Sequence, residues 1–149
     1  DWSAPAGEKA EVSEYSWGRP PFFEWAAEEH RACREDVVLM DMSFMSKFIV
    51  QGRDALECLE WVSCNKLDVP VGRIVYTQWT NVRGGIEADL TITRLALQEF
   101  MVVCSDTAHS HVETWMRRNI REDAHVSITD VPSGRAMLTI QGPKSRALL

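Results

Sequence analysis

The apolar and polar positions of the chain are most informative between residues 75 and 95. After the pair Gly84-Gly85 the two kinds of residue alternate, with Ile86, Ala88, Leu90 and Ile92 in one set and Glu87, Asp89, Thr91 and Thr93 in the other. A period of two places the two sets on opposite faces of a strand. The glycines supply the positive φ that tight hairpin turns require. Residues 75–95 are therefore predicted to form a β-hairpin.

Pairing within this hairpin brings two polar side chains into reach of each other. If the turn contains an even number of residues, Tyr76 lies on the same face as Asp89, at a diagonal position. An odd-length loop would break this prediction. A carboxylate and a phenol beside threonine hydroxyls form either a small-molecule site or a hydrated surface, and the residues alone leave both interpretations open.

The rest of the pattern predicts further elements on both sides of the hairpin. Helices are expected at about 22–34, 54–65 and 106–120 and after Gly142, and strands at 37–40, 44–50, 100–104, 126–131 and 137–140. Asp54 and Glu57 have the spacing of a capping box, and Asp106 can cap the third helix. The order α-β-β-α-β-β-β-α-β-β-α predicts an α+β fold, in which helices cover a mainly antiparallel sheet. No internal repeat stands out.

Composition narrows the class of protein without naming a function. The 149 residues are enough for one domain with a real core, and we expect a lead-in at residues 1–21 before a folded domain at residues 22–149. A net charge of −6 weighs against a nucleic-acid partner. No apolar run is long enough to span a bilayer, and no signal peptide is visible. A cytoplasmic protein with no membrane partner is the expectation.

Metal-ligating and nucleophilic patterns are weak. The cysteines, Cys33, Cys58, Cys64 and Cys104, form no C-x-x-C pair, so we expect reduced thiols and no metal site. His30, His109 and His111 are expected on the surface. Met40, Met42 and Met45 are expected in the core, with a Met-lined pocket as the alternative. The sequence contains no G-x-G-x-x-G, P-loop or G-x-S-x-G motif.

Three blocks of residues carry a resemblance to a known family: 76–90 with its Gly84-Gly85 and Asp89, 34–50 with Asp41-Met42-Ser43, and Gln141-Gly142-Pro143. Together they resemble the folate-binding domain of the aminomethyltransferase family, typified by the T-protein of the glycine cleavage system. Residues 14–20, 46–48 and 85–95 are most similar to the C-terminal part of FAD-dependent dimethylglycine and sarcosine dehydrogenases and oxidases.

The resemblance implies a fold, a cofactor and site residues. The fold would consist of ferredoxin-like subdomains, and tetrahydrofolate would be the cofactor. Asp89 would sit at the reacting nitrogen of the folate as a base or electrostatic stabiliser, which fits the chemistry of a carboxylate. Tyr76 would line the folate pocket, and Met45 would pack on the ligand. An upstream domain, absent from this chain, would hold FAD and oxidise the amine to an imine.

Some positions depart from the family pattern. Thr93 stands where the T-protein has a tyrosine, Phe44 replaces a histidine and Ala88 replaces an aspartate. The family's remaining folate contacts are expected beyond Leu149, so residues 22–149 would be the N-terminal part of a truncated domain. Such a fragment is expected to lack amine-oxidising activity and to self-associate through uncovered apolar surface.

Two other functions remain open at this point. One is a T-protein-like aminomethyltransferase that takes its one-carbon unit from a lipoyl carrier. The other is a non-catalytic folate-binding or regulatory module. The encoded sequence upstream of Asp1 discriminates the flavoprotein from the T-protein, because a strand, turn and helix with G-x-G-x-x-G would favour the flavoprotein.

Overall fold

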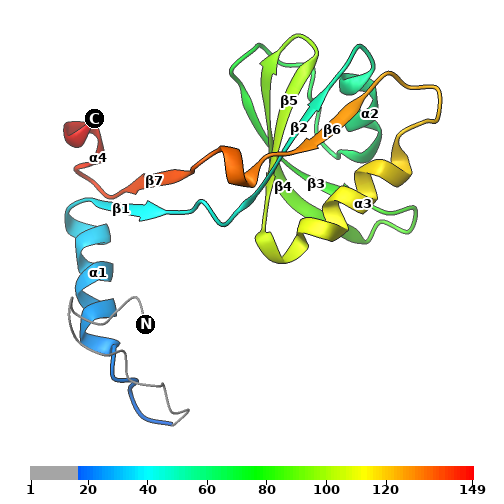
Figure 1. Cartoon of the computed structure of the whole chain (residues 1–149). Coiled ribbons are helices and arrows are strands. Elements are labelled where there is room, and N and C mark those ends of the chain that lie inside the picture. The colour runs from blue at the N-terminus through cyan, green and yellow to red at the C-terminus, as the bar shows by residue number, and fades with distance from the viewer. Residues whose placement is uncertain (1–16) are drawn as a thin grey trace. The chain divides into compact units, whose positions relative to one another are not determined.

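The computed structural model describes residues 17–149 (Figure 1). Its elements are α1 (Phe23–Glu35), β1 (Val38–Asp41), β2 (Ser46–Gln51), α2 (Ala55–Val62), β3 (Ile74–Thr80), β4 (Ile86–Ala96), β5 (Glu99–Cys104), α3 (His109–Asn119), β6 (Ser127–Asp130), β7 (Leu138–Gln141) and α4 (Ser145–Leu148), with 3₁₀ turns at Asp106–Ala108 and Pro132–Gly134. The predicted order of helices and strands is confirmed. Most of the predicted lead-in lies outside the described residues.

The chain divides into two compact units. The larger unit, Asp41–Met137, contains a five-stranded sheet in the order β3-β4-β5-β2-β6. All four of its strand pairings are antiparallel. The smaller unit combines the chain up to Met40 with Leu138–Leu149 and contains the two-stranded sheet of β1 and β7. The predicted α+β class with a mainly antiparallel sheet is confirmed.

One face of the five-stranded sheet, the helix face, carries the core. Alternate residues of every long strand point to it, and α2 and α3 cover it with their own apolar stripes. The buried cluster contains Phe48, Val50, Ala55, Leu59, Val62, Leu67, Trp79, Ala88, Leu90, Ile92, Phe100, Val102, Cys104, Val112 and Met116. The opposite face, the open face, carries the other alternate residues, among them Tyr76, Gln78, Asp89, Thr91 and Val103.

The hairpin of β3 and β4 places Tyr76 and Asp89 on the same face, as predicted, although its loop is odd in length. Thr80 pairs with Ile86, so five residues lie between them, and an odd loop alone would put Tyr76 and Asp89 on opposite faces. A β-bulge between Trp79 and Thr80 shifts the register by one residue. The bulge restores the even relationship, because an extra residue on one strand reverses the alternation beyond it.

The bulge also corrects the prediction at the start of β4. Ile86 is 69 % exposed instead of joining the core, and Glu87 leaves the face of Asp89. The Glu87 carboxylate accepts a hydrogen bond from Asn81 Nδ2 at 2.7 Å and lies 3.0 Å from Nε2 of His111, on α3. Regular alternation therefore begins only at Ala88. Of the two glycines in the turn, Gly84 has the positive φ, at 78°.

The predicted helix caps are wrong. Asp54 makes no capping bond to α2, because its Oδ2 accepts a hydrogen bond from the backbone N–H of His125 at 2.7 Å. This bond ties the start of α2 to the chain that enters β6. Asp106 lies in the 3₁₀ turn before α3 and caps nothing. Both residues lie at the start of a helical segment, as predicted. The Asp54 carboxylate, however, accepts a bond from His125, and the Asp106 carboxylate makes no bond to the helix.

A similar strand–glycine–helix motif occurs once in each unit. β2 leads through Gln51-Gly52 into α2, and β7 leads through Gln141-Gly142 into α4. Both glycines have positive φ, at 141° and 117°. A Cβ at Gly52 would lie 2.0 Å from the carbonyl oxygen of His125, and a Cβ at Gly142 would lie 2.3 Å from that of Asp36.

The similarity extends along the adjacent strands. Val131 N–H, just after β6, donates to Lys47 in β2, and Met42 N–H, just after β1, donates to Met137, just before β7. Each unit therefore contains the same motif, in which a strand crosses close to a neighbouring backbone at a glycine and continues into a helix.

Candidate functional site

Tyr76, Gln78 and Asp89 form a cluster on the open face of the sheet. Gln78 pairs directly with Asp89 across β3 and β4, and Tyr76 pairs with Thr91, one diagonal away. Gln78 Nε2 donates a hydrogen bond to Oδ1 of Asp89 at 3.1 Å. The Tyr76 hydroxyl also interacts with the Asp89 carboxylate across this diagonal. The predicted meeting of Tyr76 with Asp89 is thus confirmed, and Gln78 is a member of the cluster that the sequence analysis did not identify.

The charge of the Asp89 carboxylate affects the pKa of the Tyr76 phenol. The hydrogen bond to Asp89 raises the pKa of Tyr76 above its usual value, because loss of the phenol proton would remove the bond and place a second negative charge beside the carboxylate. Partial desolvation raises the pKa further, and the Gln78 amide opposes the shift by stabilising the phenolate. The phenol of Tyr76 therefore keeps its proton at neutral pH and remains a hydrogen-bond donor.

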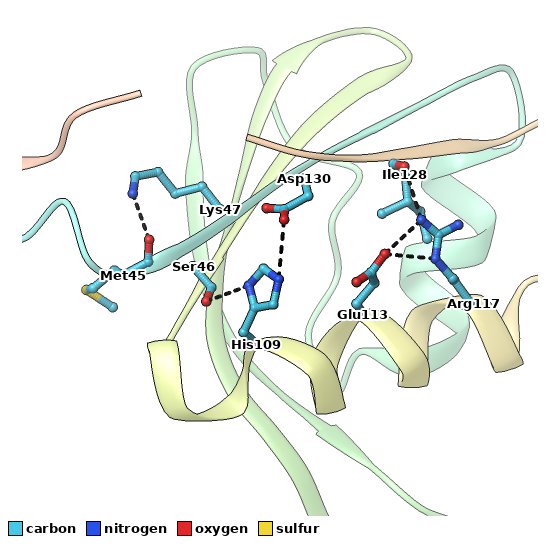
Figure 2. A network of polar contacts seen from close by, with 8 residues as sticks. All are labelled: Met45, Ser46, Lys47, His109, Glu113, Arg117, Ile128 and Asp130. Atoms are coloured by element: carbon cyan, nitrogen blue, oxygen red, sulfur yellow. Dashed lines mark hydrogen bonds and ion pairs between the residues drawn. The ribbon is translucent and has the colours of Figure 1, made fainter. Parts of the chain in front are cut away.

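Met45 lies in a turn just before β2. Its N–H donates to the carbonyl of Met42 at 3.0 Å, and Ser43 N–H donates to Oδ1 of Asp41 at 2.8 Å. Lys47 is only 2 % exposed, and its Nζ donates to the carbonyl oxygens of Ser43 at 3.0 Å and of Met45 at 2.7 Å. The buried ammonium thereby fixes the turn that carries Met45 (Figure 2).

Met45 has an indirect relation to the cluster. Lys47, two residues along β2, belongs to the open-face row Tyr76–Thr91–Val103–Lys47. Met45 itself directly precedes Ser46, the first residue of β2. The methionines as a group are not core residues, contrary to the prediction, because Met40 is 39 % exposed while Met42 and Met45 are half-buried.

A second polar network joins α3 to the sheet (Figure 2). The ring of His109 lies 2.9 Å through Nδ1 from Oγ of Ser46 and 3.3 Å through Nε2 from Oδ2 of Asp130. The ring also stacks on Phe48 at 4.9 Å between centroids. His109 is therefore half-buried rather than on the surface, whereas His30 and His111 are exposed as predicted.

The serine, histidine and aspartate of this network have the residue types of a hydrolytic triad but not its exposure. Ser46 is 2 % exposed and lies under α3, while Asp130 is the more open end. A nucleophile must reach its substrate, so the arrangement fits a link between α3, β2 and β6. No sequence signal could have revealed it, because residues 46, 109 and 130 meet only in the fold.

Other chemistry is sparse in the described part of the chain. Residues 17–149 contain no group of three or more His, Cys, Asp or Glu side chains that could hold a metal ion. Within the same residues no helix combines the length and apolar character needed to cross a membrane. A hollow of about 520 Å³ lies between the ends of α2 and α3, lined by Trp61, Asn119 and Arg121 among others, away from Asp89.

Comparison with known proteins relates the chain to an oxidase and to a regulatory subunit. It is 43 % identical over 136 residues to 4-methylaminobutanoate oxidase (formaldehyde-forming) of Paenarthrobacter nicotinovorans. The aligned region is 91 % of the chain and 16 % of the oxidase. It is 34 % identical over 129 residues to the mitochondrial pyruvate dehydrogenase phosphatase regulatory subunit of Mus musculus. That aligned region is 85 % of the chain and 15 % of the subunit. The chain thus spans about a sixth of the length of these curated relatives.

The fold has a counterpart among solved structures. Glycine cleavage system aminomethyltransferase T from Bartonella henselae superimposes with a TM-score of 0.75 at 28 % identity, over 82 % of this chain and 33 % of that one. The predicted resemblance to the aminomethyltransferase family is confirmed, and 4-methylaminobutanoate oxidase is one of the relatives. The family model of the GCVT N-terminal domain matches residues 3–149, and the chain belongs to that family.

Proposed function

We propose that the chain is part of a tetrahydrofolate-dependent one-carbon transfer domain in an FAD-dependent oxidase or dehydrogenase of N-methyl amines, of the dimethylglycine or sarcosine type. The observation that carries the proposal is the Tyr76–Gln78–Asp89 cluster on the open face of the sheet. Membership of the family and the similarity to 4-methylaminobutanoate oxidase support it. The FAD domain would lie upstream, and the protein would be cytoplasmic.

The residues around Asp89 fit a flat, partly polar ligand. Beside the cluster, the half-buried side chains of Met101 and Val103 in β5 give the open face an apolar patch against which a planar ring can lie. Asp89 remains exposed, so its carboxylate is accessible to a ligand on this face. Met45, in the turn just before β2, would contact the ligand from the side.

Tetrahydrofolate, when bound, supplies a ring nitrogen that takes up a one-carbon unit. Asp89 accepts the proton that this nitrogen releases, since a carboxylate within hydrogen-bond reach can act as a general base. Its negative charge also stabilises the positive charge of the one-carbon donor. Tyr76 would line the pocket beside the carboxylate, and the sheet supplies the rigid base on which these side chains stand.

The test is Asp89→Asn in the intact protein, assayed for transfer of the one-carbon unit to tetrahydrofolate and for folate affinity by titration. We expect transfer to fall at least a hundredfold, because an amide cannot accept the proton, while folate affinity changes by less than about threefold. Asp123→Asn, an equivalent change at an exposed position, is the control. Unchanged transfer in Asp89→Asn would refute the role of Asp89.

A regulatory module without transfer activity is the second candidate. The 34 % identity to a phosphatase regulatory subunit favours it specifically. In that case the wild-type intact protein would bind tetrahydrofolate or a partner protein but transfer no one-carbon unit. The same assay therefore separates the two functions before any variant is made.

A further inference from the structure

Gln78 occupies a special position beside Asp89. It is the direct cross-strand neighbour of Asp89, and its Nε2 donates to one particular carboxylate oxygen, Oδ1, at 3.1 Å. Gln78 is half-buried, whereas Asp89 is exposed. A half-buried donor on the facing strand loses little conformational freedom when it bonds, so it restrains an exposed partner efficiently.

One hydrogen bond alone would leave the Asp89 carboxylate free to rotate. An aspartate on a strand has two side-chain torsions, and the outer torsion is broad. Tyr76, on the diagonal position, can donate to the same carboxylate from a different direction. Two donors on neighbouring positions restrict both torsions, and a carboxylate with about four acceptor sites still has capacity left for a ligand proton.

We infer that Gln78 is a positioning residue for the one-carbon transfer, one that aims the Asp89 carboxylate through its hydrogen bond to Oδ1 without contacting the reacting atoms. The inference rests on the proposed function. It predicts that loss of the Gln78 donor slows turnover while folate binding is retained. The reason is that a base displaced by a fraction of an ångström still attracts the ligand but reacts slowly.

Gln78→Leu removes the donor at nearly constant volume, and Gln78→Glu keeps the shape but replaces the donor with a second carboxylate. In the intact protein we expect kcat to fall about tenfold in Gln78→Leu and further in Gln78→Glu, with KM for tetrahydrofolate within about twofold of wild type. Gln51→Leu is the matched control, because Gln51 is exposed at the far end of β2.

A second measurement detects the cluster without any reaction. Tyrosine labelled with ¹³C at Cζ reports phenol titration by NMR, and a Tyr76→Phe spectrum identifies the signal. Gln78→Leu should move the titration midpoint of Tyr76 upward, because the amide that opposes the raised pKa is lost. Gln51→Leu should leave the midpoint in place. A purely structural role for Gln78 would not shift the phenol in this direction.

The outcomes distinguish this inference from the function on which it rests. A slower kcat at unchanged KM together with a raised phenol midpoint supports the positioning role. Wild-type kcat in folded Gln78→Leu, or an unmoved midpoint, overturns the inference and leaves the proposed function intact. Absence of one-carbon transfer in the wild type overturns the proposed function, and the positioning role for that reaction fails with it.

Discussion

The backbone crossing at Gly52 should tolerate no side chain. In Gly52→Ala the added Cβ would lie 2.0 Å from the carbonyl oxygen of His125 and 3.0 Å from Cα of Val126. Since Cβ contacts under 3.0 Å essentially do not occur, the His125 carbonyl has to move by about 1 Å. That carbonyl belongs to the segment tied to Asp54 and leading into β6, so the shift strains a hydrogen bond and a strand pairing.

The expected loss of stability follows from separate contributions. The positive φ of 141° costs an alanine about 1–2 kcal/mol. Displacing packed backbone adds about 1–3 kcal/mol, and weakening the hydrogen bond between His125 and Asp54 adds about 1 kcal/mol. Alanine also lowers the conformational entropy of the unfolded chain, which stabilises the folded state by about 0.4–1 kcal/mol and offsets part of the loss. The net destabilisation of Gly52→Ala should therefore be about 4 kcal/mol.

Two other glycines separate strain from steric conflict. Gly84→Ala meets nothing within 4 Å but has a φ of 78°, so it should cost about 1 kcal/mol from strain alone. Gly134→Ala meets nothing within 4 Å and lacks a positive φ, so it should stay within about 0.5 kcal/mol of wild type. Urea denaturation followed by tryptophan fluorescence gives the midpoint and the m-value for each variant. The explanation is refuted if Gly52→Ala and Gly84→Ala agree within about 0.5 kcal/mol at equal m-values.

Two further predictions concern titratable groups. The hydrogen bond from His125 N–H lowers the pKa of Asp54 in the folded state, so its stabilising effect is present above the ordinary value of 3.8 and is lost as pH falls below it. The Tm difference between wild type and Asp54→Asn should therefore shrink from pH 7 to pH 3, and a constant difference would contradict this. Burial raises the pKa of the Cys104 thiol to about 11, so a thiol reagent at pH 8 should label exposed Cys64 in the native chain but reach Cys104 only after denaturation. Mass spectrometry of the labelled peptides checks this, with Cys64→Ser as control, and rapid native labelling of Cys104 would show that the burial is wrong.

Local patterns predicted much of the fold and part of the site. Alternation after Gly84 specified β4, and cross-strand geometry placed Tyr76 beside Asp89. The argument succeeded only because the bulge compensated for an odd loop. A bulge costs one residue of regular pairing and leaves no mark in a pattern of apolar and polar residues. Its position is explained by the bonds of Glu87 to Asn81, within the hairpin, and to His111, which is in place only after α3 has packed.

Features that depend on distant residues were missed for the same reason. Asp54 has the local spacing of a cap, yet its partner His125 is 71 residues away. The half-buried His109 depends on Ser46 and Asp130, which come from two different strands. Gln78 was overlooked because an amide on a polar strand face is ordinary until its cross-strand partner is known. Tertiary contacts of this kind override local preference.

The sheet of β1 and β7 has a consequence for the order of folding. Its two strands are separated by about a hundred residues, and closing such a loop is entropically costly, with each doubling of length adding about 0.6 kcal/mol. Folding of Asp41–Met137 removes most of that cost. Met42 N–H bonds the carbonyl of Met137 at 2.8 Å, and Met137 N–H bonds Oγ of Ser43 at 3.0 Å, so the two chain ends leave the larger unit side by side. The effective loop then shortens by about four doublings, or about 2.4 kcal/mol. Folding of the larger unit is therefore expected to precede the pairing of β1 with β7. During synthesis β1 stays unpaired until β7, about a hundred residues later, has been made.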